Sequence, residues 1–355
     1  MNKIEKFKRY YKEVKKDLDE MINGFNKGIV KENNKILKDN LELFAELNSN
    51  GKLVRGTLVN LGYYLLKEDK EYSNYLSLAY EVFQTAILVH DDIIDNDEKR
   101  RGKDTIHFAN MKKYSKYDEN VRDLGNNIAI CMGNYGLYLS NQLISKNYCN
   151  DPNLGKVLNC FNDTVLKTVK GELLDIILPF QGKHNLLKAS EIEKNIIEIF
   201  RLKTAHYTIV GPMSVGLLLA GAEEEKLKEI EEFGEKIGIA FQIQDDILGI
   251  YSDAMEKNKD SDIKEFKQTI LYSHIINTKY KEEFLKYYGN DNLKENDIEI
   301  VKDLFKKSGS YDYANDMMNK YYDEGLKVLN NIKWINKDKK DLLEGFVEYL
   351  RVRNK

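Results

Sequence analysis

The sequence reads Ala-Ile-Leu-Val-His-Asp-Asp-Ile-Ile-Asp at residues 86–95 and Ile-Gly-Ile-Ala-Phe-Gln-Ile-Gln-Asp-Asp-Ile-Leu-Gly-Ile at residues 237–250. Each stretch places adjacent aspartates among apolar residues that favour burial. Because buried carboxylates are costly and adjacent ones repel each other, two such clusters require a compensating cation. The two stretches therefore predict a metal site.

The residues around both stretches are patterned for helices. Apolar residues recur every three or four positions, and the 355 residues include only 3 prolines,. Helices are expected over the first forty or so residues and then at about 52–68, 74–96, 120–147, 154–178, 190–221, 223–251, 262–280, 297–329 and 338–352. The breaks between them are too short, and too poor in Pro, Gly and Ser, to be linkers. We therefore predict a single all-α domain over residues 1–355.

The two acidic helices are expected to face each other in this bundle, because metal sites in bundles are built from side chains on facing helices. Asp91 and Asp95 are four residues apart and share one helix face, whereas Asp92 points partly aside. The candidate ligands are carboxylate oxygens, which favour Mg²⁺ before Mn²⁺, and bound Mg²⁺ usually keeps substrate phosphates as ligands. The substrate is therefore expected to carry phosphate.

Basic residues occur where a phosphorylated substrate would need them. Lys52 and Arg55 follow a glycine at the start of a predicted helix, whose first amides also favour anions,. Arg100 and Arg101 follow Asp95 closely enough to hold diphosphate oxygens beside the metal ions.

Composition excludes several other classes of protein. The net charge is −3 with both signs interspersed, which argues against nucleic acid as a partner,. The three cysteines, Cys131, Cys149 and Cys160, lack the spacing of a disulfide framework or a zinc site, and we expect them to be reduced core residues,. No stretch resembles a membrane span or a signal peptide, so we expect a cytoplasmic protein.

The ordered motifs resemble the trans-polyprenyl diphosphate synthases, the head-to-tail prenyltransferases of the farnesyl and geranylgeranyl type in isoprenoid biosynthesis. The resemblance covers about residues 50–270. Its motifs are Gly51-Lys52-x-x-Arg55-Gly56, Gln84, Val89-His90-Asp91-Asp92-Ile93-Ile94-Asp95, Arg100-Arg101-Gly102, Lys203-Thr204 and Phe241-Gln242-x-Gln244-Asp245-Asp246.

The resemblance implies an all-α prenyl synthase fold, that of the class I terpenoid synthases, with a deep cavity in each subunit of a homodimer. It implies three magnesium ions, two held by Asp91 and Asp95 and the third by Asp245, with Asp92 and Asp246 as weaker candidates for direct ligands. The implied substrates are isopentenyl diphosphate and an allylic diphosphate. By position, isopentenyl diphosphate would be bound by Lys52, Arg55, Gln84 and Arg101, and the allylic substrate by Arg100, Lys203, Thr204, Gln242 and Lys267.

The implied reaction is ionisation of the allylic carbon–oxygen bond, attack by the isopentenyl double bond and loss of a proton, with Asp91, Asp95, Asp245, Lys203 and Arg100 as catalytic residues. Metal ions and cationic side chains would stabilise the departing diphosphate.

The sequence also departs from the family pattern. Gly249 replaces a third aspartate that many relatives have. The usual Gly-Gln-x-x-Asp reads Gly171-Glu172-Leu173-Leu174-Asp175. In the loop after Asp253, either Lys257 or Lys259 can be the diphosphate-binding lysine.

Product length is expected to depend on the helix before Asp91. Residues Phe83 and Ile87 precede Asp91 by eight and four positions on the same face, and Ala86 leaves room for a growing chain,. Phe83 is then the expected floor of the pocket, which favours geranylgeranyl diphosphate over farnesyl or longer products.

Other functions remain open at this point. A class I terpene cyclase or a head-to-head synthase shares the helical cavity and the metal chemistry, but a cyclase needs no isopentenyl diphosphate site. A catalytically silent regulatory subunit, paired with an active synthase as a heterodimer, would not need intact acidic motifs. A di-iron bundle would require Glu-x-x-His pairs, which we do not find.

Overall fold

The computed structural model describes residues 2–49, 51–184, 186–251, 261–290 and 292–352. Helices dominate it, which confirms the predicted all-α class, and strands within those residues are limited to β1 (Lys99–Arg100) and β2 (Lys103–Asp104). Contacts group the chain into two compact units. We call residues 9–160 with 212–222 the Asp91 unit, and residues 1–8, 161–211 and 223–355 the Asp245 unit. The single domain stays a prediction.

The Asp91 unit holds the first acidic motif near the end of a long helix. Its elements are residues 9–29 of α1 (Lys3–Ile29), α2 (Lys35–Ser49), α3 (Val54–Tyr64), the 3₁₀-helix η1 (Lys70–Ser73), α4 (Asn74–Ile94), β1, β2, α5 (Ile106–Tyr114), α6 (Arg122–Asn147), residues 154–160 of α7 (Leu154–Lys183), and residues 212–219 of α9 (Gly211–Leu219).

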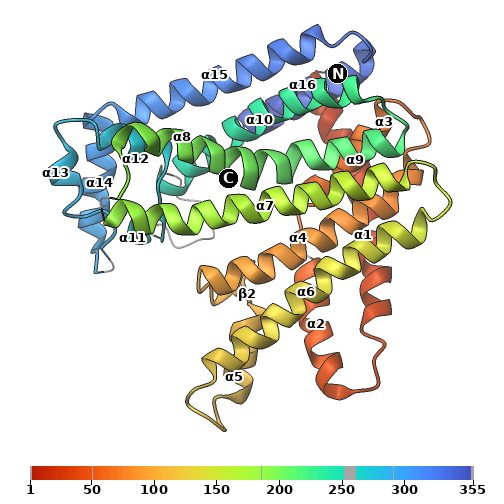
Figure 1. Ribbon diagram of the computed structural model, residues 1–355, viewed down its shortest axis with the longest axis horizontal. Helices are drawn as coiled ribbons and strands as arrows, with labels where there is room; N and C mark the ends of the chain where they lie inside the picture. Colours follow the sequence, from red (N-terminus) through yellow and green to blue (C-terminus); the bar gives the residue numbers. More distant parts are fainter. Residues whose placement is uncertain (1, 50, 185, 252–260, 291, 353–355) are drawn as a thin grey trace. The chain divides into compact units, whose positions relative to one another are not determined.

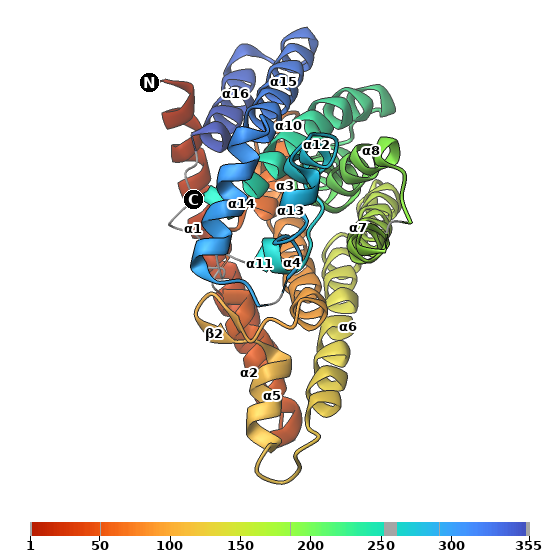
Figure 2. The same cartoon turned by 90° about the vertical axis from the view of Figure 1, so that its left-hand side faces the viewer.

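Helix α4 packs against α6, and Figure 2 shows the two side by side. The helices approach closely where Ala86 meets Gly136. A Cβ atom added at Gly136 would lie 2.8 Å from the Cβ of Ala86 and 2.7 Å from Cζ of Phe44. Only glycine fits such a gap, so this contact fixes α4 against α6.

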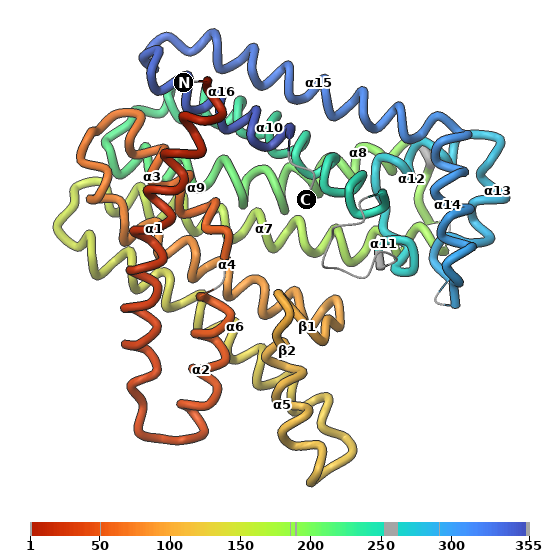
Figure 3. Tube along the Cα trace, turned by 180° about the vertical axis from the view of Figure 1, so that it is seen from behind, coloured from red at the N-terminus to blue at the C-terminus, as the bar shows by residue number. Residues whose placement is uncertain are grey.

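The first forty residues do not form one continuous helix, because α1 ends at Ile29 and α2 begins at Lys35 and runs back alongside it (Figure 3). The side chain of Asn34 caps α2: its Oδ1 accepts from the N–H groups of Ile36 at 2.9 Å and Leu37 at 3.2 Å,. The amide of Asn26 then ties α1 to α2, donating to the carbonyl of Ala45 at 2.9 Å.

A short antiparallel hairpin follows α4, with Arg100 paired to Lys103. Its two turn residues, Arg101 and Gly102, have φ values of 53° and 76°. Two successive positive φ angles are typical of the tight turn that matches strand twist, and glycine adopts such angles without strain. The sequence indicated a break here but neither the hairpin nor α5.

The Asp245 unit holds the second acidic motif. Its elements are residues 3–8 of α1, residues 161–183 of α7, α8 (Ala189–Ile199), the π-helix η2 (Phe200–Val210), the first residue of α9, α10 (Glu224–Tyr251), α11 (Ser261–Lys264), α12 (Ile270–Ile275), α13 (Lys281–Phe284), α14 (Glu295–Lys307), α15 (Ser310–Asn331) and α16 (Lys337–Arg351).

Helix α10 is the centre of this unit and packs against η2 and α15 (Figure 1). Residues Ile239, Ile243 and Ile247 are spaced four apart and lie in the buried hydrophobic cluster. The helical period then places Gln242 and Asp245 on other faces of α10, where both are partly exposed,. The core thereby sets the orientation of the second motif.

The segment predicted as one helix over 190–221 is divided into α8, η2 and α9. In the middle part the backbone follows the wider π-helix, a form often found at functional sites,. Helix α7 lies against it at Gly171, where an added Cβ would be 2.6 Å from the backbone nitrogen of Lys203.

Three further expectations can be compared with the structure. The predicted helix over 297–329 is broken at Gly309, which has a φ of 75°. The prediction of core cysteines is wrong for Cys131 and Cys149, whose side chains are exposed. Among the helices of the described ranges, none combines the length and apolar character needed to cross a membrane.

Candidate functional site

The first acidic motif closes α4, which ends at Ile94 with Asp95 as its C-cap. Asp92 is buried, with 1% of its side chain exposed, whereas Asp91 is 18% exposed. The guanidinium of Arg100 donates to Asp92 through Nε and to Asp91 through Nη2, the latter at 3.3 Å. The hairpin therefore returns an arginine to the end of α4, as its position after the motif predicts.

The electrostatics of this motif suit a cation. Burial raises the pKa of Asp92 to about 7, even though Arg100 favours its charged form. Within the described part of the chain, Oδ2 of Asp92 is buried and accepts no hydrogen bond. A buried carboxylate oxygen that accepts no hydrogen bond is well suited to coordinate a hard divalent cation. The residues therefore fit the predicted magnesium site.

The residues predicted to bind isopentenyl diphosphate lie in the same unit. Lys52 is exposed just before α3, and its carbonyl accepts from the hydroxyl of Tyr11. Arg55 is in the first turn of α3, and Gln84 is partly buried in α4. Arg101 donates from Nη1 to the carbonyl of Leu47 at 3.1 Å. A pocket beside it is lined by Leu43, Glu46, Leu47, Arg100, Arg101, Lys103, Asp104, Thr105 and Ile106.

The second motif gathers several of the residues predicted to bind the allylic substrate. Asp246 is buried, and its Oδ1 accepts from Nε2 of Gln242 at 3.0 Å. Thr204 donates to Oε1 of Gln242 at 2.6 Å, and the ammonium of Lys267 lies 3.2 Å from the same Asp246 oxygen. Asp245 is partly exposed one residue earlier.

The charges here resemble those of the first motif. Burial raises the pKa of Asp246 to about 6, against the attraction of Lys267. Burial disfavours the charged lysine, but Asp246, Asp262 and Asp175 outweigh it and hold the pKa of Lys267 well above its ordinary value. Oδ2 of Asp246 is likewise buried without a hydrogen-bond partner among the described residues, so this carboxylate also fits a cation.

Lys203 pairs with two acids of α7. Its ammonium is 2.7 Å from Asp175 and 2.8 Å from Glu172. Glu172 is the residue that replaces the glutamine of the family pattern, so the departure adds a negative charge beside a predicted diphosphate-binding lysine.

Two other predictions have a different outcome. Lys257 and Lys259 lie outside the described residues.

The residues predicted to set product length are buried. Phe83 and Ala86 are fully buried and Ile87 is partly buried, but the small size of Ala86 also has a packing reason, its contact with Gly136. Their role in product length stays a prediction, as does the meeting of the two acidic motifs in one cavity.

The sequence reasoning missed Glu81. This acid lies inside the apolar pattern of α4 and is 3% exposed. Its only signal was a charged residue at a position where the helical period predicts burial.

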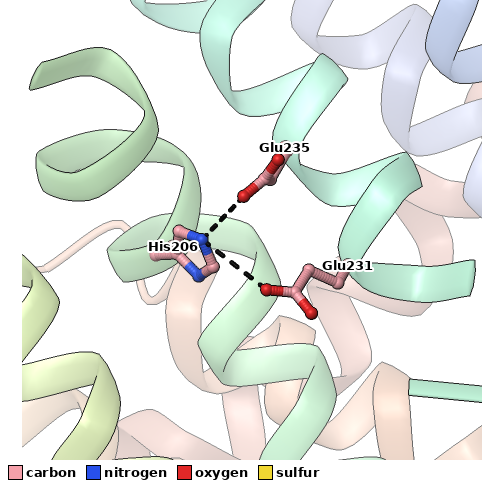
Figure 4. Close-up of side chains that lie close together, drawn as sticks. All are labelled: His206, Glu231 and Glu235. Atoms are coloured by element: carbon pink, nitrogen blue, oxygen red, sulfur yellow. Dashed lines mark hydrogen bonds and ion pairs between the residues drawn. The ribbon is translucent and has the colours of Figure 1, made fainter. Parts of the chain in front are cut away.

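A separate cluster of metal-ligand type is formed by His206 of η2 with Glu231 and Glu235 of α10 (Figure 4). His206 Nε2 lies 2.8 Å from Glu235 and 3.8 Å from Glu231. The ammonium of Lys167 is 3.8 Å from Glu231, and the guanidinium of Arg201 is 3.3 Å from Glu235. The two glutamates of the cluster already pair with Lys167 and Arg201, so we interpret the cluster as a set of polar contacts that joins η2 to α10.

Comparisons with known proteins agree with the resemblance. Residues 35–305 match the family model described as polyprenyl synthetase. The chain is 29% identical over 333 residues to geranylgeranyl diphosphate synthase of Sulfolobus acidocaldarius, covering 92% of each chain. It is 30% identical over 270 residues to farnesyl pyrophosphate synthase 2 of Arabidopsis thaliana, covering 72% of this chain and 73% of that one.

The fold has solved counterparts. Geranylgeranyl pyrophosphate synthase from Corynebacterium glutamicum, crystallised with isoprenyl diphosphate and magnesium, matches with a TM-score of 0.85 at 20% identity, covering 97% of this chain and 99% of that one. The likeness confirms the predicted prenyl synthase fold.

Proposed function

The chain belongs to the polyprenyl synthetase family, and from this premise we propose that it joins isopentenyl diphosphate head-to-tail to an allylic diphosphate. It is an isoprenyl diphosphate synthase by family. The observation that supports the finer proposal is an arrangement of charged residues that occurs at both acidic motifs. Asp92 beside Arg100, and Asp246 beside Lys267, each combine a buried carboxylate with a predicted diphosphate-binding cation.

We propose Asp91, Asp95 and Asp245 as magnesium ligands, with Asp92 and Asp246 as additional candidates. Bound magnesium supplies Lewis-acid withdrawal of charge from the diphosphate that leaves the allylic carbon. The carboxylates would hold the ions, and burial raises the pKa of Asp92 and of Asp246, as expected of carboxylates whose charge a bound cation would compensate,.

The cationic side chains have two tasks in this proposal. Arg100, Lys203 and Lys267 stabilise the negative charge that develops on the leaving diphosphate, with Thr204 and Gln242 orienting it by hydrogen bonds. Lys52, Arg55, Gln84 and Arg101 hold the second diphosphate, so that the isopentenyl double bond can attack the allylic cation. We name no protein base, because the released diphosphate can accept the proton.

We propose geranylgeranyl diphosphate as the leading product. The relative from Sulfolobus acidocaldarius is named as a geranylgeranyl diphosphate synthase, and its similarity covers 92% of this chain. The relative from Arabidopsis thaliana is named as a farnesyl pyrophosphate synthase, and its similarity covers 72% of this chain. Phe83, fully buried eight residues before Asp91, is the proposed floor of the product pocket.

A homodimer is also part of the proposal. Helix α7 carries an exposed apolar row at helical spacing, formed by Leu166, Val169, Leu173, Ile176, Ile177 and Phe180. Exposed apolar rows of this kind mark interaction surfaces. A heterodimer would use the same apolar row of α7.

The cytoplasmic location of the protein stays a prediction.

The decisive experiment incubates the purified protein with radiolabelled isopentenyl diphosphate and dimethylallyl, geranyl or farnesyl diphosphate, with magnesium or with a chelator. We expect elongated products only with the metal. Asp91→Asn and Asp245→Asn should each lower the rate by about a thousandfold or more, while Asp303→Asn, an exposed acid of α14, serves as the matched control. Absence of elongation with every primer would favour a cyclase or a silent subunit instead.

A further inference from the structure

Glu81 is a carboxylate at a buried position, which is unfavourable unless its charge is compensated. It lies in the middle of α4 with 3% of its surface exposed, and burial raises its pKa. A buried acid is retained only where polar or charged partners compensate for the lost water.

The first partner of Glu81 is the start of α3. Its Oε1 accepts from the backbone N–H of Gly56 at 2.7 Å. That N–H has no acceptor within the helix, because Thr57 is the first residue whose N–H reaches back, to the carbonyl of Leu53,. Leu53 itself, with a φ of 54°, offers no side-chain cap. Glu81 therefore caps α3 from a different helix.

Packing allows this cap only because residue 56 is glycine. A Cβ atom there would lie 3.0 Å from the carbonyl oxygen of Ser77 and 3.2 Å from Cγ of Glu81. The first turn of α3 is thus pressed against α4 at the carboxylate, and the turn contains Arg55.

The other partners of Glu81 are positive charges. Arg55 and Arg101 both favour its ionised form electrostatically, with Lys15 a weaker contributor. Burial lowers the pKa of Arg101, and the charge of Glu81 opposes this effect while the charges of Arg100 and Arg55 add to it. The acid is therefore the common counter-ion of two arginines from separate segments, α3 and the β-hairpin.

From these contacts we propose that Glu81 is a positioning residue for isopentenyl diphosphate. Its carboxylate holds the first turn of α3 and the two arginines, Arg55 and Arg101, in the arrangement that receives the diphosphate. The inference rests on the function proposed above, which assigns those arginines to that substrate, and it adds a residue that itself does not touch the substrate.

The test compares Glu81→Gln with the wild-type protein in two measurements, affinity for isopentenyl diphosphate by titration calorimetry and steady-state kinetics. Glutamine keeps an acceptor for the Gly56 amide but removes the charge. We expect the Kd and KM for isopentenyl diphosphate to rise about tenfold while the KM for the allylic diphosphate changes less than about twofold. Glu81→Asp, which keeps the charge, should restore part of the loss.

Ser77→Ala is the matched control, because Ser77 is fully buried one turn earlier on α4 and its carbonyl also lies near Gly56. It should leave both KM values unchanged. If Glu81→Gln does not fold, as judged by thermal denaturation, the same comparison is made with Glu81→Asp, whose shorter reach should raise the KM for isopentenyl diphosphate alone.

Two outcomes would overturn the inference: an unchanged affinity for isopentenyl diphosphate, or a parallel loss for both substrates. Failure of the proposed function gives a different result. In that case the wild-type protein itself makes no elongated product and binds no isopentenyl diphosphate, whereas failure of the inference alone leaves both wild-type properties intact.

Discussion

The carboxylate oxygen Oδ1 of Asp246 lies 3.2 Å from the ammonium nitrogen of Lys267. The pair joins α10 to the segment just after α11, and Gln242 donates to the same oxygen. A carboxylate that is this deeply buried depends on its cation for ionisation. Lys267 therefore both stabilises the second acidic motif and, in the proposed function, serves the allylic diphosphate.

Replacing Lys267 with Gln should impair catalysis more than it impairs folding. Loss of the charge raises the pKa of Asp246 further and removes a cation from the leaving group, so we expect kcat/KM for the allylic substrate to fall about a hundredfold. Lys286→Gln, at an exposed position of the same unit, is the control. Equal kinetics for the two variants would exclude Lys267 from the site.

Glu172→Gln restores the residue of the family pattern and should tighten substrate binding. Glu172 lies 2.8 Å from the ammonium of Lys203 and, in the proposed function, would compete with the diphosphate for it. Without that charge the KM for the allylic diphosphate should fall about threefold, compared with an exposed control, Glu282→Gln,. A higher KM would instead show that Glu172 contributes to binding.

Phe83→Ala should lengthen the products, as chromatography of the dephosphorylated alcohols would reveal. The variant should also lose about 3–5 kcal/mol of stability, because Phe83 is fully buried,. Unchanged product length would reject Phe83 as the floor.

Ala86→Phe is predicted to act differently from a product-shortening substitution. A Cβ atom added at Gly136 would lie 2.8 Å from the Cβ of Ala86, so α4 and α6 approach closely at residue 86. A larger ring there should cost about 1–3 kcal/mol through overpacking, which a lower melting temperature would report. A fully stable variant with shorter products would show that residue 86 faces the growing chain.

His107 should make the protein less stable in mild acid. The side chain is 5% exposed, and burial lowers its pKa below the ordinary value of 6.5. The unfolded chain therefore binds a proton near pH 6.5 that the folded chain resists, so stability falls as the pH drops below that value. His107→Gln should reduce the difference in unfolding free energy between pH 7.5 and 5.5, with a substitution at the exposed residue His184, His184→Gln, as the control.

Leu173→Glu should convert the proposed dimer into monomers. Leu173 is 52% exposed in the middle of the apolar row of α7, and a charge buried there would oppose association,. Light scattering after size-exclusion chromatography measures the mass directly. The control is Leu186→Glu, at a residue that is 65% exposed beyond α7. A monomeric wild-type protein would contradict the proposal.

Long periodic helices were predictable from the sequence. Helix α4 was expected at 74–96 and occurs at Asn74–Ile94, and α10 was expected at 223–251 and occurs at Glu224–Tyr251. These helices bury a continuous apolar face, so the three- and four-residue period is strong in the sequence. The acidic motifs were placed correctly near their ends for the same reason.

The parts that were missed depend on contacts between distant residues. The π-helical form of η2 is a matter of backbone hydrogen-bond register, which the side-chain pattern does not encode,. The pairing of Lys203 with Glu172 and the cap that Glu81 provides to Gly56 join different helices. Local periodicity contains no information on such pairs.

The two-residue turn of the β-hairpin gives Arg100 and Arg101 different partners, the aspartates of α4 for the first and the carbonyl of Leu47 for the second. Arg100 ends β1, whereas Arg101 is the first turn residue with a positive φ, so a longer turn would move the guanidinium of Arg101 relative to that of Arg100,. The length of this loop is therefore as restrictive as its composition. Grafting a longer loop from another protein would separate the arginines from their assigned partners even if both were retained.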